Sequence, residues 1–449
     1  MSTSAFSTEC PSSQSPFFSQ QSTSSSIQHD GDGSPYRAAF TQSLALQPRD
    51  TLHFSTYGMG LAPDVSFESV QSTHAFLTAN MNEIWPLFFE HDLPAAERNV
   101  LASLGLTGDD YSQDQPTFHV NFGANVHEFL VRLFSCHRQN DTPLTVVTSD
   151  AEFVSLTRQL ASWSHVVDVT TVPLQPHASF GSRLRQRVAV LSPTLVHVSA
   201  VYSNSQYRFP DSELTALVDE LPPGSMCIVD VAQAFENVVL QLPRSKSLVV
   251  VGSGVKHATA GPGMGFVAFP VNAWTPANTG WIAHLGSMTR APSSTVEYTP
   301  ELAFAGGTPG YHYAVRQFND VQAFYSAKQW TLATRHAYVL TLQAQFIQWL
   351  AHAKVLEPQN EHEGVHESDV YNRSKAIVLT HSQADKVHHH LVTPTSSRPT
   401  VFHCDVRLGD RLRLGFGLHH VPSEVRALAD AVIDGWHELH TTERIRLYL

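Results

Sequence analysis

Two residues of this sequence combine a reactive side chain with a position suited to a buried site: a lysine that follows an apolar run and an aspartate that ends one. Lys256 stands among the small residues of 252–263, directly after the apolar run 248–251, and Asp230 ends the apolar run 226–230. A lysine partly removed from water has a lowered pKa and can form a Schiff base with a carbonyl. A surface lysine in a glycine-rich turn, and an aspartate that only caps a strand, are the alternatives that these segments leave open.

The elements that would bring these side chains together are predicted by an alternation of strands and helices. Strands are expected at 117–120, 144–148, 165–172, 195–201, 226–230 and 248–251, with helices at 124–136, 152–163, 182–187 and 211–220. Such alternation is typical of βαβ units, which build a mostly parallel sheet with helices on both faces. Ligands bind at the carboxyl ends of the strands in these sheets, and Asp230 and Lys256 would both lie there.

The remaining segments predict three parts of the chain. Residues 1–45 start with a tract rich in Ser, Thr and Gln and are expected to form a disordered or loosely packed arm. Residues 46–305 would form the large α/β domain, whose first part can pack on the small domain. Residues 306–449 would form a linking helix, within 311–354, and a small α+β domain at the C-terminal end.

The composition argues against several classes of protein. Among 449 residues, 28 Lys and Arg stand against 40 Asp and Glu, and the net charge of -12 disfavours a surface for nucleic acid or anionic membranes. No apolar run reaches the roughly 20 residues of a membrane span, and no signal-peptide pattern opens the chain. The four cysteines form no metal-type pair, which favours a reducing compartment. We therefore expect a soluble cytoplasmic protein.

The 26 histidines include clusters at 388–390, 419–420 and 361–366. A zinc site would need a ligand spacing such as His-Glu-x-x-His or a cysteine partner, and no cluster has either. We expect no metal site from this pattern.

The motifs around the aspartate and the lysine resemble those of a known group of enzymes. Val-Asp-Val-Ala-Gln at 229–233, Gly-Ser-Gly-Val-Lys-His at 252–257 and Gly-Pro-Gly at 261–263 are similar to the signature of fold-type I pyridoxal-phosphate enzymes. Within the class-V aminotransferase group, the kynureninase branch is the most similar. The resemblance extends over nearly the whole chain after the arm. It implies an α/β fold with a mostly parallel, seven-stranded sheet flanked by helices, and pyridoxal 5'-phosphate as cofactor.

The resemblance also assigns roles to individual residues. Lys256 would form the Schiff base with the cofactor, Asp230 would keep its pyridine nitrogen protonated, and Arg413 would bind the substrate carboxylate through two parallel hydrogen bonds. Tyr57, in the loop 54–60, is expected beside the substrate. Further cofactor contacts are expected from Phe122 and Gly123 in the phosphate segment 121–127, Phe153 on the ring face, Ser155 near the phosphate, and Asn204, Gln233 and His257.

Two further segments imply a homodimer with shared active sites. Gly280-Trp281 and 306–309, which includes Thr308, match segments that reach the phosphate of the neighbouring subunit in kynureninases. Ordinary core packing is the alternative for Trp281. A strand-surface position is the alternative for Arg413, because Arg407 and Arg411 compete for its role.

Several positions depart from the family pattern. Gln233 stands where kynureninases have a histidine, and His257 stands where they have a tyrosine. Ala200 replaces the histidine of a Ser-His pair, and Gln206 replaces a glycine. The phosphate, ring and carboxylate contacts are thus mostly retained, while the groups around the reacting side chain are altered.

We predict an enzyme that removes the α-proton of an amino acid with Lys256 and then cleaves or eliminates at Cβ, as a kynureninase-like hydrolase or lyase. An aminotransferase is the alternative with the same first step, and a catalytically altered binding or regulatory protein is the alternative of another class. A cysteine desulfurase is disfavoured, because its persulfide cysteine should lie on a mobile loop. Cys404 instead lies in an apolar strand, and Cys136 lies near a helix end.

Overall fold

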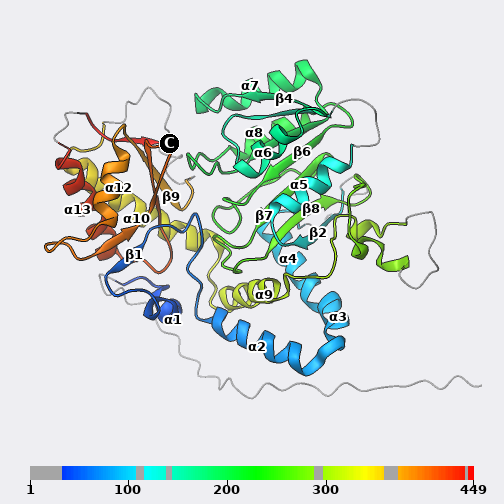
Figure 1. Ribbon diagram of the computed structural model, residues 1–449, viewed down its shortest axis with the longest axis horizontal. Coiled ribbons are helices and arrows are strands. Elements are labelled where there is room, and N and C mark those ends of the chain that lie inside the picture. The colour runs from blue at the N-terminus through cyan, green and yellow to red at the C-terminus, as the bar shows by residue number, and fades with distance from the viewer. Residues whose placement is uncertain are drawn as a thin grey trace, which may run out of the picture.

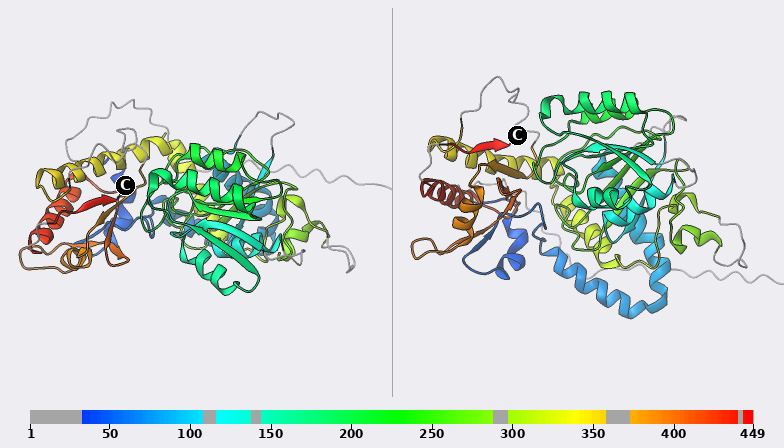
Figure 2. Two further views of the ribbon diagram at one scale, coloured as in Figure 1. Left: turned by 90° about the horizontal axis from the view of Figure 1, so that it is seen from above. Right: turned by 45° about the horizontal axis from the view of Figure 1, so that its top comes forward.

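The computed structural model describes residues 33–107, 116–137, 144–287, 297–357, 373–439 and 443–448. They form a large domain around a seven-stranded sheet and a small domain around a four-stranded sheet, which lie side by side in Figure 1. Helix α10 (Leu332–His352) runs along the small domain toward the large one, as the view from above shows (Figure 2).

The sheet of the large domain is mostly parallel. Its strands stand in the order β2-β8-β7-β6-β5-β3-β4, and β8 is the one strand of these seven that runs against the others. The strands are β2 (Phe118–Gly123), β3 (Leu144–Ser149), β4 (Val167–Val172), β5 (Leu195–Ser199), β6 (Met226–Asp230), β7 (Leu248–Ser253) and β8 (Gly265–Pro270). The expected α/β class, with a mostly parallel seven-stranded sheet flanked by helices, is confirmed.

The central strands are apolar along their whole length because helices cover both faces of the sheet. On one face, Leu195, Ile228 and Val249 pack under α5 and α6. On the other face, Val196 and Val229 pack under α4, α7, α8 and α9. The covering helices are α4 (Leu93–Leu104), α5 (Val126–Ser135), α6 (Val154–Ser162), α7 (His177–Leu191), α8 (Asp211–Asp219) and α9 (His312–Ala327).

Two details of the large domain differ from the sequence-based expectations. Strand β8 is absent from the predicted strands. It runs antiparallel to its neighbours β2 and β7, so it does not belong to the βαβ alternation on which the prediction was based. Helix α9 lies beyond the predicted boundary at 305, yet its Val315 and Phe318 belong to the core of the large domain. Below α9 in Figure 1 runs α2 (Val65–Asn80), which packs against it. Short helical segments complete this domain: η2 (Met81–Glu83), α3 (Ile84–Leu87), η3 (Phe88–Asp92), η4 (Trp281–Ser287) and η5 (Pro300–Leu302).

The small domain combines an antiparallel sheet with a short parallel pair. The sheet has the order β11-β12-β9-β13, and β1 pairs with β10. Helices α10, α12 and α13 supply the apolar residues that cover these strands. The bounds are β1 (Thr51–His53), β9 (Ala376–Thr380), α12 (Ala384–Val392), β10 (Val401–His403), β11 (Asp405–Arg407), β12 (Arg411–Gly415), α13 (Pro422–His437) and β13 (Arg446–Tyr448).

Part of the predicted arm is folded, which corrects the expectation for 33–45. These residues form η1 (Arg37–Phe40) and α1 (Thr41–Ala45). Tyr36 and Phe40 are buried in the core of the small domain, so burial of apolar surface holds the segment in place. The first 32 residues of the arm lie outside the described residues.

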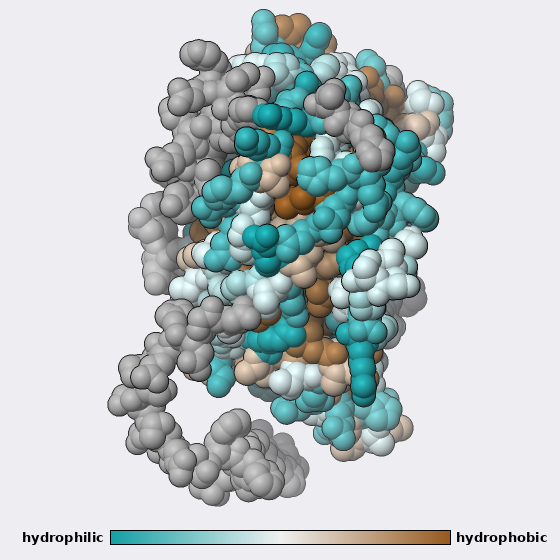
Figure 3. All heavy atoms as spheres, turned by 90° about the vertical axis from the view of Figure 1, so that its left-hand side faces the viewer, coloured by the Kyte–Doolittle hydropathy of each residue, from teal (hydrophilic) through white to brown (hydrophobic). Residues whose placement is uncertain are grey.

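The surface of the small-domain end is mainly hydrophilic, with a narrower hydrophobic strip between polar side chains (Figure 3). Across the described ranges, no helix has both the length and the apolar character needed to cross a membrane. The histidine cluster at 361–366 lies outside the described residues. Among the described residues, no group of three or more His, Cys, Asp or Glu side chains converges as a set of metal ligands.

Candidate active site

A cavity of about 450 Å³ opens at the carboxyl ends of β5, β6 and β7, where ligands of parallel sheets bind. Its wall contains Lys256, Asp230, Gln233, Phe153 and Ser155, five of the residues singled out from the sequence. The volume is in the range of pockets for cofactors and small molecules. Lys256 and Asp230 therefore face one common space.

Asp230 is the last residue of β6 and is held with its carboxylate toward the cavity. Its Oδ1 accepts a hydrogen bond from the backbone N–H of Ala232 at 2.7 Å. Burial raises the pKa of the Asp230 carboxyl, while the nearby His197 and Lys256 lower it in part. A cationic N–H group placed against this carboxylate would remove the penalty of burying its charge.

Lys256 follows β7 in a turn that packs closely against the loop 54–60. Its carbonyl oxygen accepts a hydrogen bond from the N–H of Gly60 at 3.0 Å. Burial lowers the pKa of Lys256, Asp230 raises it in part, and the charge of Arg413 lowers it. The ring of Phe153 lies 5.9 Å from Nζ. The lysine is thus held at the wall with a lowered pKa, as a nucleophilic amine requires.

A buried acid that was not singled out from the sequence, Glu152, lies behind the cavity wall and contacts two of its residues. Glu152 accepts hydrogen bonds from Ser149 at 2.8 Å and from Ser199 at 2.6 Å. Its Oε2 also lies 3.4 Å from Nδ1 of His197. Both His197 and Ser199 line the cavity. The register of β5 with β6, which pairs Ser199 with Asp230, places this group directly beside the aspartate.

One end of the cavity is suited to an anion. Asn125 caps α5 by accepting a hydrogen bond from the N–H of Glu128 at 3.2 Å, and the first helical residues line the cavity. A helix N-terminus offers backbone N–H groups and a favourable dipole to a phosphate. Ser155, in the first turn of α6, and Ser253, at the end of β7, add hydroxyl groups to the wall.

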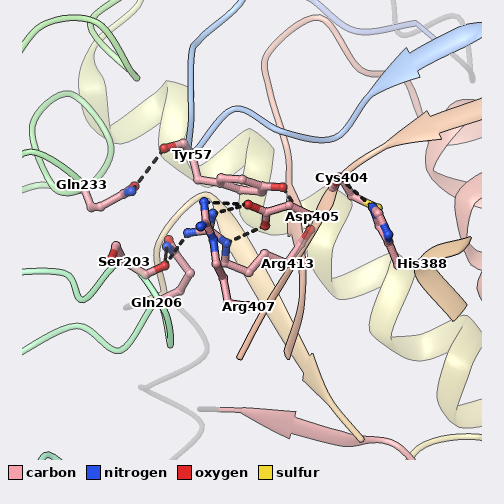
Figure 4. A network of polar contacts seen from close by, with 9 residues as sticks. All are labelled: Tyr57, Ser203, Gln206, Gln233, His388, Cys404, Asp405, Arg407 and Arg413. Atoms are coloured by element: carbon pink, nitrogen blue, oxygen red, sulfur yellow. Dashed lines mark hydrogen bonds and ion pairs between the residues drawn. The ribbon is translucent and has the colours of Figure 1, made fainter. Parts of the chain in front are cut away.

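Arg413 lies beside the cavity, held by residues from both domains (Figure 4). Its Nε and Nη2 donate to the two oxygens of Asp405 at 2.7 and 2.5 Å. Its Nη1 donates to the carbonyl of Ser203, a residue of the cavity wall, at 2.5 Å. The ring of Tyr57 stacks on the guanidinium at 4.1 Å. Arg413 is buried, so the strand-surface alternative is wrong.

The two departures that follow Asp230 and Lys256 have different surroundings. Gln233 lines the cavity and donates from Nε2 to the carbonyl of Tyr57 at 3.1 Å, which leaves its buried Oε1 without a protein partner. His257 instead lines a second, smaller cavity with Thr259 and Lys375. The expected place of His257 beside the cofactor is therefore corrected: as the next residue after Lys256, it points to the other side of the turn.

Five other predicted residues lie outside the cavity wall. Phe122 and Gly123 belong to β2, where Phe122 packs in the core of the large domain. Asn204 lies beyond Ser203, which takes the place on the wall expected for it. Trp281 is 44% exposed, so the core-packing alternative is wrong for it, and Thr308 is also exposed.

Several wall residues were not singled out from the sequence, although the first of them lies in the predicted phosphate segment 121–127: Asn125, His197, Ser199, Ser203 and Ser253. Asn125 could have been found as a helix N-cap, since an Asn before an apolar periodic segment is a start signal. His197 and Ser199 could have been found from the two-residue periodicity of a strand, because alternate residues of β5 share one face. The place of Ser203 depends on a loop conformation that no pattern signals.

No family model matches this chain, and no curated protein matches it. Several solved structures do match this chain. A mutant of C-DES with glycine covalently linked to its pyridoxal-phosphate cofactor matches with a TM-score of 0.67 at 14% identity, over 89% of this chain and 99% of that one. The cysteine desulfurase of Thermococcus onnurineus NA1 matches with a TM-score of 0.66 at 13% identity, over 86% and 95%.

The cysteine desulfurase CsdA of Escherichia coli also matches, with a TM-score of 0.64 at 15% identity over 90% of this chain and 98% of that one. The similarity covers both domains and leaves little of the solved chains unmatched. It does not single out the kynureninase branch. The chain has the fold of the fold-type I pyridoxal-phosphate enzymes, which it shares with these solved structures.

Proposed function

We propose that this protein is a pyridoxal-phosphate-dependent enzyme that removes the α-proton of an amino acid and then eliminates a group from Cβ. The observation that carries the proposal is the convergence of Lys256 and Asp230 in one cavity at the carboxyl ends of β6 and β7. The fold shared with C-DES, whose structure carries this cofactor, supports the same choice.

The residues of the cavity fit the cofactor. The buried carboxylate of Asp230 suits its protonated ring nitrogen, and the unpartnered Oε1 of Gln233 offers an acceptor beside the ring. Phe153 would lie on the ring face, and Lys256 would hold the aldehyde carbon. The N-terminus of α5, with Ser155 and Ser253, would hold the phosphate.

When bound, the cofactor withdraws electrons from Cα and so makes the α-proton of an amino acid removable. Lys256 is the residue of the wall suited to take that proton, since burial lowers its pKa and so favours a neutral amine as general base. Arg413 would bind the substrate carboxylate, which fixes the direction in which the Cα–H bond points.

The cysteines favour elimination to solution over transfer to a protein thiol. Of the cysteines that the structure describes, none lines the cavity. Burial raises the pKa of Cys136, Cys227 and Cys404 to about 12 in each case, and a thiol in that state is a poor nucleophile. A cysteine desulfurase needs a nucleophilic thiol close to the sulfur that leaves the substrate. The described part of the chain supplies none.

We infer that the leaving group is a sulfur. C-DES is a cystine C–S lyase whose reaction product is cysteine persulfide, which supports a sulfur-bearing amino acid as substrate. Kynureninase-like cleavage begins with the same proton removal but then has to break a carbon–carbon bond. The side chain of Gln233 cannot titrate and His257 lies off the wall, so neither offers a base for that step.

The exposed Trp281 and Thr308 support a homodimer with shared sites. Both are polar or aromatic groups on the surface of the single chain, and aromatic residues are enriched at protein interfaces. In this arrangement each subunit would complete the phosphate end of its partner's cavity.

The cofactor is tested by reconstitution. Wild-type protein incubated with pyridoxal phosphate and passed through a desalting column should keep a visible absorption band, and Lys256→Ala should lose it. Lys328→Ala, which removes an exposed lysine at the end of α9, is the matched control and should keep the band. A wild-type protein that stays colourless would contradict the proposal.

The reaction is tested by product analysis. Single amino acids, including cystine and cysteine, are incubated with the reconstituted protein with and without an added keto acid. Release of a keto acid that lacks the Cβ substituent, without any added keto acid, is the expected result. A strict need for an added keto acid would instead identify an aminotransferase.

A further inference from the structure

Gln206 has a backbone conformation that glycine would adopt more easily. Its φ of 59° lies in the left-handed region, where any residue with a Cβ is disfavoured relative to glycine. The residue is also buried, at 7% exposure, in the loop that follows β5. A long side chain that is kept at a strained and buried position has to make contacts there that a glycine could not make.

Both ends of the Gln206 amide make hydrogen bonds. Its Nε2 donates to the carbonyl of Ser203 at 3.1 Å, and its Oε1 accepts from the hydroxyl of Ser374 at 2.8 Å. Ser203 belongs to the large domain and lines the cavity, while Ser374 precedes β9 of the small domain. The side chain therefore connects the cavity wall to the small domain.

The carbonyl of Ser203 is also the acceptor for Arg413, at 2.5 Å from Nη1. Figure 4 shows Gln206 and Arg413 approaching this oxygen together. Asp405 binds the other side of the guanidinium, through Nε and Nη2. A guanidinium has five N–H groups, so these contacts leave one N–H on each terminal nitrogen for a ligand carboxylate.

We propose that Gln206 is a positioning residue for Arg413: it fixes the Ser203 carbonyl and thereby aims the remaining N–H groups of Arg413 at the substrate carboxylate. This inference rests on the proposed function, since it deepens the role of Arg413 in that site. Gln206 itself is not part of the cavity wall. A glycine at this position would relieve the backbone strain but would leave the carbonyl of Ser203 fixed by Arg413 alone.

The test compares Gln206→Ala with Gln206→Gly in the full reconstituted protein. Both variants remove the amide, but alanine keeps the backbone strain and glycine relieves it, so glycine should have the higher Tm of the two. If Gln206 positions Arg413, both variants should show the same rise in KM, about three- to tenfold for one lost hydrogen bond. Their kcat should stay within about twofold of the wild type.

A matched control is available in Gln329, which is also in the left-handed region, with φ 57°, but is exposed at the end of α9. Gln329→Gly should raise Tm and leave KM unchanged. An unchanged KM in both Gln206 variants would overturn the inference. A KM that follows Tm, with alanine worse than glycine, would also overturn it, because it would indicate a structural role only.

A second readout separates this inference from the proposed function. Binding of butyrate, an unreactive carboxylate, is measured by calorimetry on the wild type and both Gln206 variants, with and without cofactor. Both variants should bind it about three- to tenfold more weakly than the wild type. Equal binding in all three proteins would refute the inference, whereas a wild-type protein that binds butyrate but no cofactor would refute the proposed function alone.

Discussion

Replacing Gly60 with alanine should displace Lys256 and lower kcat by about a hundredfold. A Cβ built on Gly60 would lie 2.2 Å from the carbonyl oxygen of Lys256 and 2.9 Å from Cγ2 of Thr259. Ordinary contact begins near 3.4 Å. Backbone on one side of this contact therefore has to move by about 1 Å, and a displacement of that size at a reacting group lowers rates by about 10².

The neighbouring Gly58 provides the matched control for this prediction. Its Cβ would lie 3.4 Å from the carbonyl of Ser55, an ordinary contact, so Gly58→Ala should keep kcat close to the wild-type value. Both variants are assayed at saturating substrate after reconstitution, and their Tm is measured without cofactor. Gly60→Ala should also be less stable, by about 1–3 kcal/mol, as expected for an overpacked contact.

The outcome for kcat decides whether the turn at Lys256 is rigid. If Gly60→Ala loses stability but keeps kcat within about twofold of Gly58→Ala, the loop 54–60 moves instead of the lysine. The contact between Gly60 and Lys256 would then be a matter of packing, and the proposal that it fixes the amine would be refuted.

Two further predictions concern buried charges. Asp230→Asn should raise the Tm of the cofactor-free protein at neutral pH. Burial raises the pKa of Asp230, so the ionised carboxylate destabilises the folded state at that pH. This gain in Tm should disappear below about pH 3.9, where the carboxyl is protonated in both the folded and the unfolded state. An equal gain in Tm at all pH values would contradict this explanation. Glu236→Gln should lower the free energy of unfolding by about 3–5 kcal/mol in urea, because it leaves Arg335, 2.7 Å away, as an unpaired buried charge. Removing Arg426 from its exposed pair with Asp430 should change the urea midpoint little, and equal losses for the two pairs would count against the burial argument.

The convergence of Lys256 and Asp230 could be predicted because it depends on strand order alone. Asp230 ends one apolar strand and Lys256 follows its parallel neighbour, and the carboxyl ends of such neighbours meet at one edge of the sheet. The same reasoning fails for His257, because adjacency in sequence does not mean a shared direction in a turn. Its side chain lies on the far side of the chain from the cavity.

The sequence could not predict features that depend on contacts between distant segments or on a second subunit. The left-handed backbone of Gln206 and the contact between Gly60 and Lys256 both depend on segments far apart in sequence. No local pattern encodes such contacts. Trp281 and Thr308 can be assigned only by resemblance, because their expected partner is another subunit. Residues 33–45 were misjudged because the polar tract before them dominates the composition of the arm.

The pairing of β1 with β10 sets an order for events during synthesis of the protein. Thr51 pairs with Val401 and His53 with His403, whereas the seven strands of the large sheet all lie within 118–270. The large sheet can therefore assemble while the ribosome is still translating the second half of the chain. β1, although among the first elements to emerge, has to wait for its partner. Until then, Phe54 and the segment that contains Phe40 remain uncovered, which makes the start of the chain the natural place for a chaperone to act.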